Sequence, residues 1–522
     1  MAHISRRAKT AAAVVTSASL FLAACGGSDS SNGAAGGGDG NGTITSAVAY
    51  ATTDYHPSRT SSALAMGTNW HVVEGLYEQD MSDYSVYKAL AAEEEPTEVS
   101  ETEYEISLRD GAKFSDGSEV TAEDVVTSFD RVMEDGNIYA PMLDFIDEVK
   151  AKDETTVTIT LKYPFSMLKE RLSVVKVVPA AATDAELTEM PIGSGPYKYE
   201  SITDAQVRAV ANDNYNGDKP AENGTLVWDV LVDDTARTTA GQSGAADVIE
   251  NIPADNAEMV EAAGMKVAEK EGFNLPFLIF NTSKEPFNDK RVRQAFHRAI
   301  DKQTLVDNNM SGKATEASSF LPESHPNYNK ASTDLSYDPA AAKKLLSEAG
   351  AEDLTVTLLT TDHTWIENLA PQIKNNLEEV GIKVNIQSQA SASLYADNLD
   401  VDDADYDVAL APGDPSVFGQ DPALLMNWWY GDNVWTQKRS FLQESDPAVY
   451  QELQDTLLEA VKLPEAEQQQ HWNKAQDLIA EQAVTYPLFH RSVLTAYNED
   501  KVSDFTPIST TGLLLLGAKS NS

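Results

Sequence analysis

Four aromatic residues stand within eight positions in the last third of the chain: Trp428, Trp429, Tyr430 and Trp435. Rigid rings that combine a large apolar surface with a polar tip are suited to lining a pocket for varied side chains or for a hydrophobic ligand. Trp428 and Trp429 are neighbours, and neighbouring side chains on regular structure cannot both face the same way. At least one of them is therefore expected to be core, and the run as a whole predicts a binding pocket.

Catalytic chemistry has little support in the sequence. There is no G-x-S-x-G nucleophile elbow and no phosphate-binding loop, and the eight histidines are scattered singly, without an HExxH or H-x-x-H pair that could hold a metal ion. His297, in a helical pattern, and His490, beside a predicted strand, are expected to pack rather than to act as ligands. Acidic pairs are too common in so acidic a chain to indicate an acid–base site. We therefore expect no catalytic residue, no metal and no cofactor.

The only cysteine, Cys25, ends an N-terminal segment that is typical of a signal peptide. A short cationic start precedes the apolar run 10–24, which is too short to span a bilayer comfortably. The last residues, "LAAC", resemble the lipobox of bacterial lipoproteins, in which the signal is removed before the cysteine and the sulfur carries a diacylglycerol. The sequence predicts a signal peptide over 1–24 and a lipid anchor at Cys25. The alternative is an ordinary secretory leader with a free thiol.

The composition of the following segments separates a tether from a folded body. Residues 25–43 are mainly Gly, Ser, Asn, Asp and Ala without apolar periodicity, so they are predicted to form a flexible linker. The rest of the chain, with 42% hydrophobic residues overall, is long enough to build a large core in two or three lobes. The formal net charge of −43 repels nucleic acid, so nucleic-acid functions are set aside.

Strand and helix patterns alternate through this body, which predicts a mixed α/β fold. Thr121 is a predicted N-cap, with Glu123 and Asp124 in the positive first turn of the helix that follows. A strand, a helix and a second strand follow a capped helix at 337–350, and this order predicts a βαβ crossover with parallel strands. The expected strands are 104–108, 156–163, 354–361 and 382–388, and the expected helices are 121–133, 337–350, 365–381, 447–462 and 464–483.

Five stretches carry a resemblance to a known family. They are, in order, "LRDGAKFSDGSEVTAEDVVTSFDRV", "PIGSGPYKYES", "NDNYNGDKP", "FNTSKEPFNDKRVRQAFHRAID" and "YDPAAAKKLLSEAG". They resemble the signature stretches of the extracytoplasmic solute-binding proteins of ABC importers, family 5, the peptide and nickel class. The resemblance implies a two-lobed periplasmic-binding-protein-like fold of type II, in which two α/β lobes close on the ligand and an extra domain is inserted in the first lobe.

Domain boundaries on this chain follow from the resemblance. It implies a first lobe of 44–70, 188–273 and 488–522, an appended domain of 71–187, and a second lobe of 274–487. Hinge crossings between the lobes are then expected near 272–280 and 485–491, where strand-like chain passes from one lobe to the other.

The resemblance also implies ligand contacts. Members that bind peptides hold the free α-amino group with an aspartate that follows a strand of the second lobe, and Asp414 matches it by its placement after "DYDVAL". Asp421, in the same run, is an alternative for this role. The segment 66–77 corresponds to the family's first-lobe loop along the ligand backbone, where Thr68, Asn69 and Trp70 are predicted to offer hydrogen bonds and a wall. A buried turn without ligand contact is the alternative. The apolar residues of the same segment are expected to be core: Val72, Val73, Leu76 and Tyr77.

Together these observations predict the substrate-binding subunit of an ABC importer. It would be a monomer on the extracytoplasmic face of the cell membrane, anchored there through Cys25, and would capture di- or oligopeptides by lobe closure and deliver them to the permease. Alternatives with the same transport role are a metal chelate, haem, glutathione or an oligosaccharide as ligand. A surface receptor, a chaperone or an enzyme on the same fold is the alternative of a different class.

Overall fold

The computed structural model describes residues 42–521. The predicted signal peptide, the anchor Cys25 and nearly all of the predicted linker lie outside the described residues. Thr43, the last residue of the predicted linker, already begins the first described strand, because it pairs with the strand that starts at Thr225.

Twelve strands form one mixed sheet, in the order β15-β14-β16-β12-β18-β11-β1-β10-β9-β8, with β13 beside β18 and β17 beside β12. Their bounds are β1 (Thr43–Val48), β8 (Tyr197–Ile202), β9 (Gln206–Ala211), β10 (Thr225–Val230), β11 (Val248–Ile249), β12 (Lys266–Phe280), β13 (Ala314–Glu316), β14 (Thr355–Thr361), β15 (Lys383–Gln389), β16 (Val408–Gly413), β17 (Thr485–Pro487) and β18 (Phe489–Tyr497).

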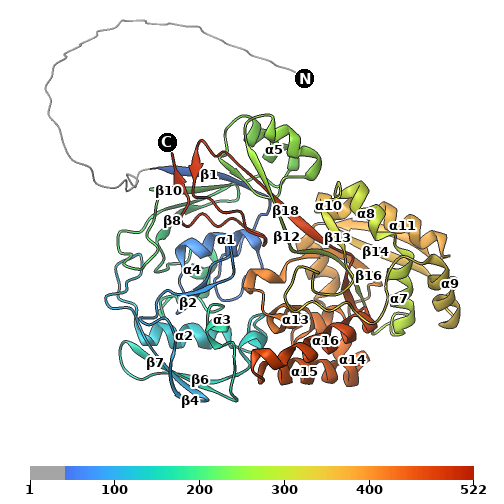
Figure 1. Ribbon diagram of the computed structural model, residues 1–522, viewed down its shortest axis with the longest axis horizontal. Coiled ribbons are helices and arrows are strands. Elements are labelled where there is room, and N and C mark those ends of the chain that lie inside the picture. The colour runs from blue at the N-terminus through green and yellow to red at the C-terminus, as the bar shows by residue number, and fades with distance from the viewer. Residues whose placement is uncertain (1–41, 522) are drawn as a thin grey trace, which may run out of the picture. The chain divides into compact units, whose positions relative to one another are not determined.

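Two long strands, β12 and β18, connect the two ends of this sheet (Figure 1). They pair antiparallel, and the pairing reaches Asn274 opposite Arg491. On its other side β18 pairs with β11, whereas β12 continues to pair with β16. Every residue of β18 is buried. Strand β12 contains the segment 272–280, and the segment 485–491 covers β17 and the start of β18; these are the two segments where hinge crossings are predicted.

The predicted βαβ crossover is confirmed. Strands β14 and β15 are parallel, with Leu358 opposite Ile386. The single helix predicted between them is instead two helices, α10 (Thr364–Glu367) and α11 (Ala370–Glu379). Pro371 lies in the first turn of α11, where its missing N–H needs no partner. For the same reason it cannot donate to the carbonyl oxygen of Glu367, the last residue of α10, so one continuous helix would lack this hydrogen bond.

A second sheet of four strands lies within the residues assigned to the appended domain, in the order β4-β5-β7-β6. Helix α2 packs on β6 and β7 through its apolar face, on which Val125, Phe129 and Val132 are buried. The predicted N-cap is confirmed as a capping box, in which Thr121 and Asp124 satisfy each other's backbone N–H. The bounds are β4 (Thr97–Ser100), β5 (Glu103–Ser107), β6 (Ile146–Ala151), β7 (Thr156–Leu161) and α2 (Ala122–Val132).

The remaining helices and short strands cover the two sheets or connect them. They are α1 (Ala63–Val72), β2 (Tyr77–Gln79), β3 (Val86–Lys88), η1 (Ala140–Leu143), α3 (Leu168–Leu172), α4 (Asp184–Glu189), α5 (Asp234–Gln242), η2 (Ala254–Asn256), α6 (Ala257–Glu261), α7 (Lys290–Ala299), α8 (Lys302–Asn309), α9 (Pro339–Glu348), α12 (Ser391–Leu394), η3 (Tyr395–Leu399), η4 (Pro415–Phe418), α13 (Pro422–Tyr430), η5 (Trp435–Arg439), α14 (Leu442–Ser445), α15 (Pro447–Val461), α16 (Glu465–Gln482), β19 (Val502–Ser503) and β20 (Lys519–Ser520). Helices α9, α15 and α16 match their predicted positions. Within residues 42–521, no helix has the length and apolar character needed to cross a membrane.

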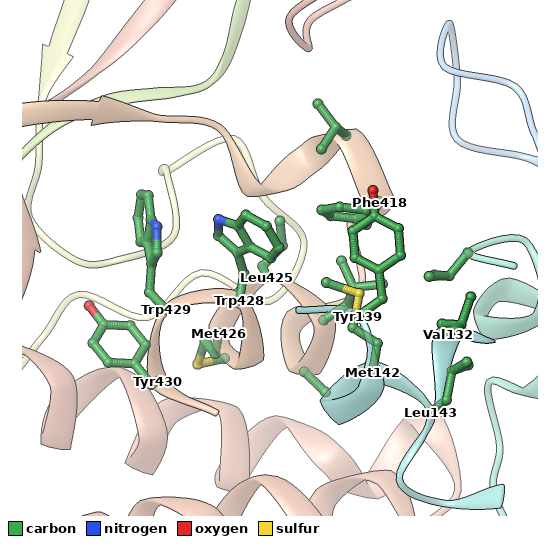
Figure 2. Packing of buried hydrophobic residues seen from close by; sticks show 14 of the residues in the cluster. Val132, Tyr139, Met142, Leu143, Phe418, Leu425, Met426, Trp428, Trp429 and Tyr430 are labelled. Carbon is green, nitrogen blue, oxygen red and sulfur yellow. The ribbon is translucent and has the colours of Figure 1, made fainter. Parts of the chain in front are cut away.

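The largest cluster of buried side chains joins segments that are far apart in the sequence. Figure 2 shows Tyr139 and Met142, from the residues around η1, beside Phe418 and the side chains of α13. The rings of Tyr139 and Phe418 meet edge to face at 4.9 Å between centroids. This apolar contact fixes α13 against the residues assigned to the appended domain.

Two histidines behave as predicted. His297 is fully buried between the rings of Phe280 and Tyr486, and neither of its ring nitrogens has a hydrogen-bond partner among the described residues. His490, buried in β18, has its Nε2 3.3 Å from the carbonyl oxygen of Ser319. Both are core residues, as their sequence positions predict.

Candidate ligand-binding site

A cavity of about 570 Å³ lies at the carboxyl ends of three strands. The residues that follow the ends of β1, β14 and β16 all reach it: Tyr50, His363 and Asp414. The rest of its lining comes from residues within 51–66, from Ile138, Asn274 and Thr511, and from residues within 391–439. Ligands of open α/β sheets bind outside the carboxyl ends of strands, so this is where the architecture favours a binding site.

Asp414 lies in the cavity wall with its carboxylate held by five hydrogen bonds. Oδ1 accepts from the backbone N–H of Ser416 (3.1 Å) and from its hydroxyl (2.6 Å), so Asp414 caps η4. Oδ2 accepts from the N–H (2.8 Å) and hydroxyl (2.7 Å) of Thr511 and from the hydroxyl of Thr510 (3.2 Å). All of these donors are neutral, so within the described residues the negative charge of Asp414 is hydrogen-bonded but not paired with a cation.

The glycine before this aspartate is required by packing. A Cβ atom at Gly413 would lie 2.6 Å from the ring of Trp429 and 3.0 Å from that of Phe277. Glycine therefore lets α13 pack closely against the end of β16, and this contact sets the position of Asp414 relative to the helix.

Asp421 is used differently. It is the N-cap of α13, accepting from the N–H of Leu424 (2.8 Å). Both of its oxygens also accept from the buried guanidinium of Arg171, at 2.9 and 2.7 Å. It is not among the residues that line the cavity. The structure thus brings Asp414 to the cavity and places the alternative aspartate in an ion pair outside it.

The four aromatic residues divide into two pairs. Trp428 and Trp435 line the cavity, and Trp428 packs against Phe418 with ring centroids 5.1 Å apart. Trp429 is only 1% exposed and lies 4.9 Å from the ring of Phe277, whereas the Tyr430 hydroxyl donates to the carbonyl oxygen of Thr485. The prediction that at least one of the adjacent tryptophans is core is confirmed, and that tryptophan is Trp429.

Residues 68–70 do not form the loop that the family resemblance implies. They belong to helix α1, in which the Thr68 hydroxyl donates to the carbonyl oxygen of Leu64 (2.9 Å) and the Asn69 amide donates to that of Tyr55 (3.1 Å). The hydroxyl of Tyr199 donates to the side chains of both Thr68 and Asn69. The expectation of a loop was wrong because these polar groups satisfy one another within and around a buried helix.

Trp70 and Asn69 border a small chamber of about 40 Å³ and do not line the cavity that contains Asp414. Met66, one turn earlier on α1, lines both. The four apolar residues of this segment are core as predicted, at 0 to 1% exposure: Val72, Val73, Leu76 and Tyr77.

Several lining residues have no counterpart in the sequence-based prediction. The rings of Tyr50 and His363 approach within 5.9 Å across the cavity wall. Burial raises the pKa of Tyr50 and lowers that of His363, so both are neutral at neutral pH. Their common signal is position, because each follows a strand whose carboxyl end opens at the site. The rule that places ligands at such ends would have selected them.

Two arginines in the lining are already paired. Arg439 donates to both oxygens of Asp400, at 2.6 and 3.0 Å, and its guanidinium lies 4.2 Å from the ring of Trp435. Arg59, which is half exposed, lies 3.8 Å from Asp54. The charges of this part of the wall therefore compensate one another, in contrast to Asp414. No cluster of three or more metal-ligating side chains is present among residues 42–521.

The site, a cavity at strand ends with one unpaired charge and aromatic walls, is that of a protein that binds a small molecule. The family model described as "Bacterial extracellular solute-binding proteins, family 5 Middle" matches residues 85–436, well over half of the chain, and the chain belongs to this family. Members of this family are extracellular binding proteins, and the family and the α/β fold class predicted from the sequence are both confirmed.

Individual relatives agree with this assignment. The chain is 27% identical to the probable D,D-dipeptide-binding periplasmic protein DdpA of Escherichia coli K12, over 76% of this chain and 78% of that protein. It is 30% identical to the glutathione-binding protein GsiB of Pectobacterium atrosepticum, over 56% of this chain and 59% of that protein. It shares its fold with the dipeptide-binding protein of Pseudoalteromonas sp. SM9913 in complex with Met-Leu, with a TM-score of 0.81 at 19% identity, covering 92% of this chain and all of that one.

Proposed function

We propose that this protein is the substrate-binding subunit of an ABC importer and that its cavity captures a di- or oligopeptide. The proposed ligand class rests on the environment of Asp414. Its carboxylate lies in the wall of the cavity, and its hydrogen bonds within the described residues all come from neutral groups. Asp414 is half-buried, and a ligand that fills the cavity would remove its remaining contact with water. A charge buried in this way is stable only when it is paired and hydrogen-bonded, and the α-ammonium of a peptide would supply the missing cation.

The remaining features of the cavity suit a ligand of this kind. Its volume of about 570 Å³ falls within the range of pockets that bury small ligands, roughly 300–1,000 Å³. Trp428, Trp435 and Tyr395 supply rigid rings that can contact side chains of varied shape. The protein is a binder in this proposal and performs no catalysis.

A non-peptide ligand is the second candidate, and the similarity to a glutathione-binding relative favours keeping it. Glutathione also carries an ammonium group, which would fit the same carboxylate. A metal chelate, haem or an oligosaccharide would have to use the aromatic walls instead.

The membrane attachment is proposed from the sequence alone. A diacylglycerol on Cys25 would hold the protein on the outer face of the cytoplasmic membrane, and the linker up to residue 43 would let a monomeric body move above it. Tethering raises the local concentration of the binding protein near a permease in the same membrane. Replacing Cys25 by alanine should release the protein from the membrane fraction, and retention of the variant there would contradict the anchor.

The test of the ligand class is native mass spectrometry of the full chain purified from cells, followed by denaturation and identification of what is released. A series of short peptides would support the proposal and show the accepted lengths. Release of one non-peptide compound would favour the second candidate. A protein that carries no ligand and binds none of a dipeptide and tripeptide mixture would contradict the peptide assignment.

A further inference from the structure

Arg491, in β18, is a buried cation without an anionic partner. Arg491 is 6% exposed, and its Nη2 donates to the side-chain oxygen of Asn251 at 2.5 Å. Nη1 is buried and has no hydrogen-bond partner among the described residues, and no carboxylate of residues 42–521 lies within 4.0 Å of the guanidinium. Burial lowers the pKa of Arg491.

The strand register places this guanidinium next to the ligand cavity. Asn274 and Arg491 are directly opposite each other in the antiparallel pair β12 and β18, so their side chains share one face of the sheet. Asn274 lines the cavity, and its side-chain oxygen is also buried without a partner. Two neighbouring buried polar groups, one at the cavity wall, thus have unused hydrogen-bonding capacity.

Aromatic side chains fix the position of the guanidinium. Trp365 of α10 lies against it, 4.6 Å from ring centroid to Cζ, and His363, two residues earlier, lines the cavity. Tyr50, also in the lining, is close enough to influence the charge of Arg491. A planar cation held between a ring and a strand is pre-organised to accept a carboxylate.

Two carboxylates act on Arg491 through space, those of Asp234 and Glu250, and both are engaged elsewhere. Asp234 accepts a hydrogen bond from the guanidinium of Arg237. Glu250 is held by the backbone. Its two oxygens accept from the backbone N–H groups of Ala49 (3.0 Å) and Gly512 (2.8 Å). Glu250 affects Arg491 only through space, and Arg237 acts on it in the opposite sense. Neither carboxylate hydrogen-bonds to Arg491, so Nη1, which has no partner among the described residues, is available to an anion that is not part of this chain.

We propose that Arg491, which is not itself in the cavity lining but lies opposite the lining residue Asn274, binds a carboxylate of the ligand. This inference deepens the proposed function and rests on it. The unpaired anion Asp414 is connected to Asn274 through Thr511, whose hydroxyl donates to Asp414 (2.7 Å) and accepts from the Asn274 amide (3.2 Å). The site therefore has a cation and an anion separated by one threonine and one asparagine, which fits a short zwitterionic ligand. The carboxylate is either the C-terminus of a dipeptide or an acidic side chain.

The test compares a free acid with its amide. Isothermal titration of the full chain with Ala-Ala, with Ala-Ala amide and with Ala-Glu amide measures the contribution of the carboxylate and its source. The wild type is expected to bind Ala-Ala at least ten-fold more tightly than Ala-Ala amide, and this ratio should fall to about one in Arg491→Gln. If Ala-Glu amide recovers the affinity, the side chain is the source of the carboxylate; if it does not, the C-terminus is.

Two further variants separate binding from stability. Arg491→Lys keeps the charge and should keep part of the preference for the acid, which also covers the case in which Arg491→Gln fails to fold. Arg293→Gln is the matched control, because Arg293, in α7, is also buried but donates to Gln482 and to the carbonyl oxygen of Phe287 and does not line the cavity. It should leave the ratio of acid to amide unchanged. An unchanged ratio in both Arg491 variants would overturn the proposal.

A second measurement keeps this inference distinct from the peptide assignment. In protein labelled with 5-fluorotryptophan, the fluorine resonance of Trp365, assigned with Trp365→Phe, reports on the neighbouring guanidinium. Sodium acetate should shift it relative to sodium chloride in the wild type but not in Arg491→Gln. If no peptide binds while acetate still shifts the resonance, the peptide function is wrong and the anion site stands. If acetate has no effect, the anion site is wrong.

Discussion

Two Asp-Pro pairs seven residues apart have the same local structure and different tertiary roles. Asp414-Pro415 begins η4 and Asp421-Pro422 begins α13, and in both the aspartate caps the helix while proline occupies the first turn. The carboxylate of Asp414 then faces the cavity with neutral donors around it. That of Asp421 is paired with Arg171, 250 residues away in the sequence.

The difference shows which part of a functional site is local. The cap is encoded by the aspartate, the proline and the next two residues, so it can be recognised in the sequence. The carboxylate oxygens also accept hydrogen bonds from a distant segment. For Asp414 the donors are Thr510 and Thr511, and for Asp421 the donor is Arg171. A carboxylate becomes available to a ligand only when that distant segment supplies no cation.

Within α13, the largest effect is expected from Trp429. Trp429→Ala removes a fully buried ring between Phe277 and Phe320 and should lower the free energy of unfolding by about 3 to 5 kcal/mol, measured by urea denaturation. Trp428→Ala is its matched control, because the adjacent ring lines the cavity. When both variants are measured in their folded state, Trp428→Ala should weaken ligand binding by a larger factor than Trp429→Ala. If the two substitutions weaken binding equally, the assignment of Trp429 to the core and of Trp428 to the cavity wall is wrong.

The ion pair at the start of α13 should give the next largest effect. Asp421→Asn leaves the guanidinium of Arg171, whose side chain is 3% exposed, without its carboxylate, and should destabilise the protein by about 3 kcal/mol. Asp144→Asn removes an exposed ion pair with Lys162 and should change stability by less than about 1 kcal/mol. Ligand affinity should stay within about two-fold of the wild type in both. A large loss of affinity in Asp421→Asn would restore Asp421 as a ligand contact.

The sequence predicts most elements of this fold because their signals are local. Thr121 is an N-cap in the structure as predicted, the capped helix predicted at 337–350 begins at the N-cap Asp338, and the parallel pair β14 and β15 follows from the order of strand and helix patterns. The break between α10 and α11 was not predicted, although Pro371 was a visible signal for it.

The walls of the cavity were harder to predict. Asp414 reaches the cavity, but α1 was mistaken for a ligand loop, because the hydrogen bonds of Thr68 and Asn69 come from Tyr199, on a strand 130 residues later. The contribution of Arg491 depends on its register opposite Asn274 across β12 and β18, and such pairing between distant strands has no local signal.

At Asp414 the expected effect is on binding. Asp414→Asn should weaken binding of a dipeptide with a free amino group by about 2 to 3 kcal/mol, or roughly 30- to 150-fold, because the ammonium loses its counter-charge. The stability without ligand should fall by only about 1 kcal/mol, since the amide oxygen can still accept hydrogen bonds from Thr511.

The control for this substitution is in the ligand. An N-acetylated dipeptide has no ammonium, so its affinity should be low in the wild type and nearly the same in Asp414→Asn. If the variant loses affinity equally for the free and the acetylated peptide, Asp414 acts by shaping the wall and does not bind the ammonium. Together with Asp421→Asn, this pair of measurements decides whether the two aspartates differ as the structure indicates.

The smallest effect is expected from His325, which contacts the chain between the two aspartates. Its Nε2–H donates to the carbonyl oxygen of Gln420 (2.8 Å), and its Nδ1 accepts from the N–H of Asn327 (3.0 Å). Burial lowers the pKa of His325, although Asp421 acts in the opposite direction. Protonation would place a hydrogen on Nδ1 and abolish its acceptor role, so the folded state favours the neutral ring.

The sign of the pH dependence follows from this preference. Because the folded pKa lies below the unfolded value of about 6.5, the unfolded chain binds more protons in the interval between the two. The stability contributed by the neutral ring is complete above about pH 6.5 and is lost as the pH falls towards the folded pKa, with a slope of at most about 1.4 kcal/mol per pH unit for one proton. Urea denaturation of the wild type and His325→Gln over this range isolates the effect, since the buried His71 and His490, each with a pKa of about 4, contribute equally to both proteins. Equal slopes would mean that His325 does not link the two Asp-Pro segments to pH.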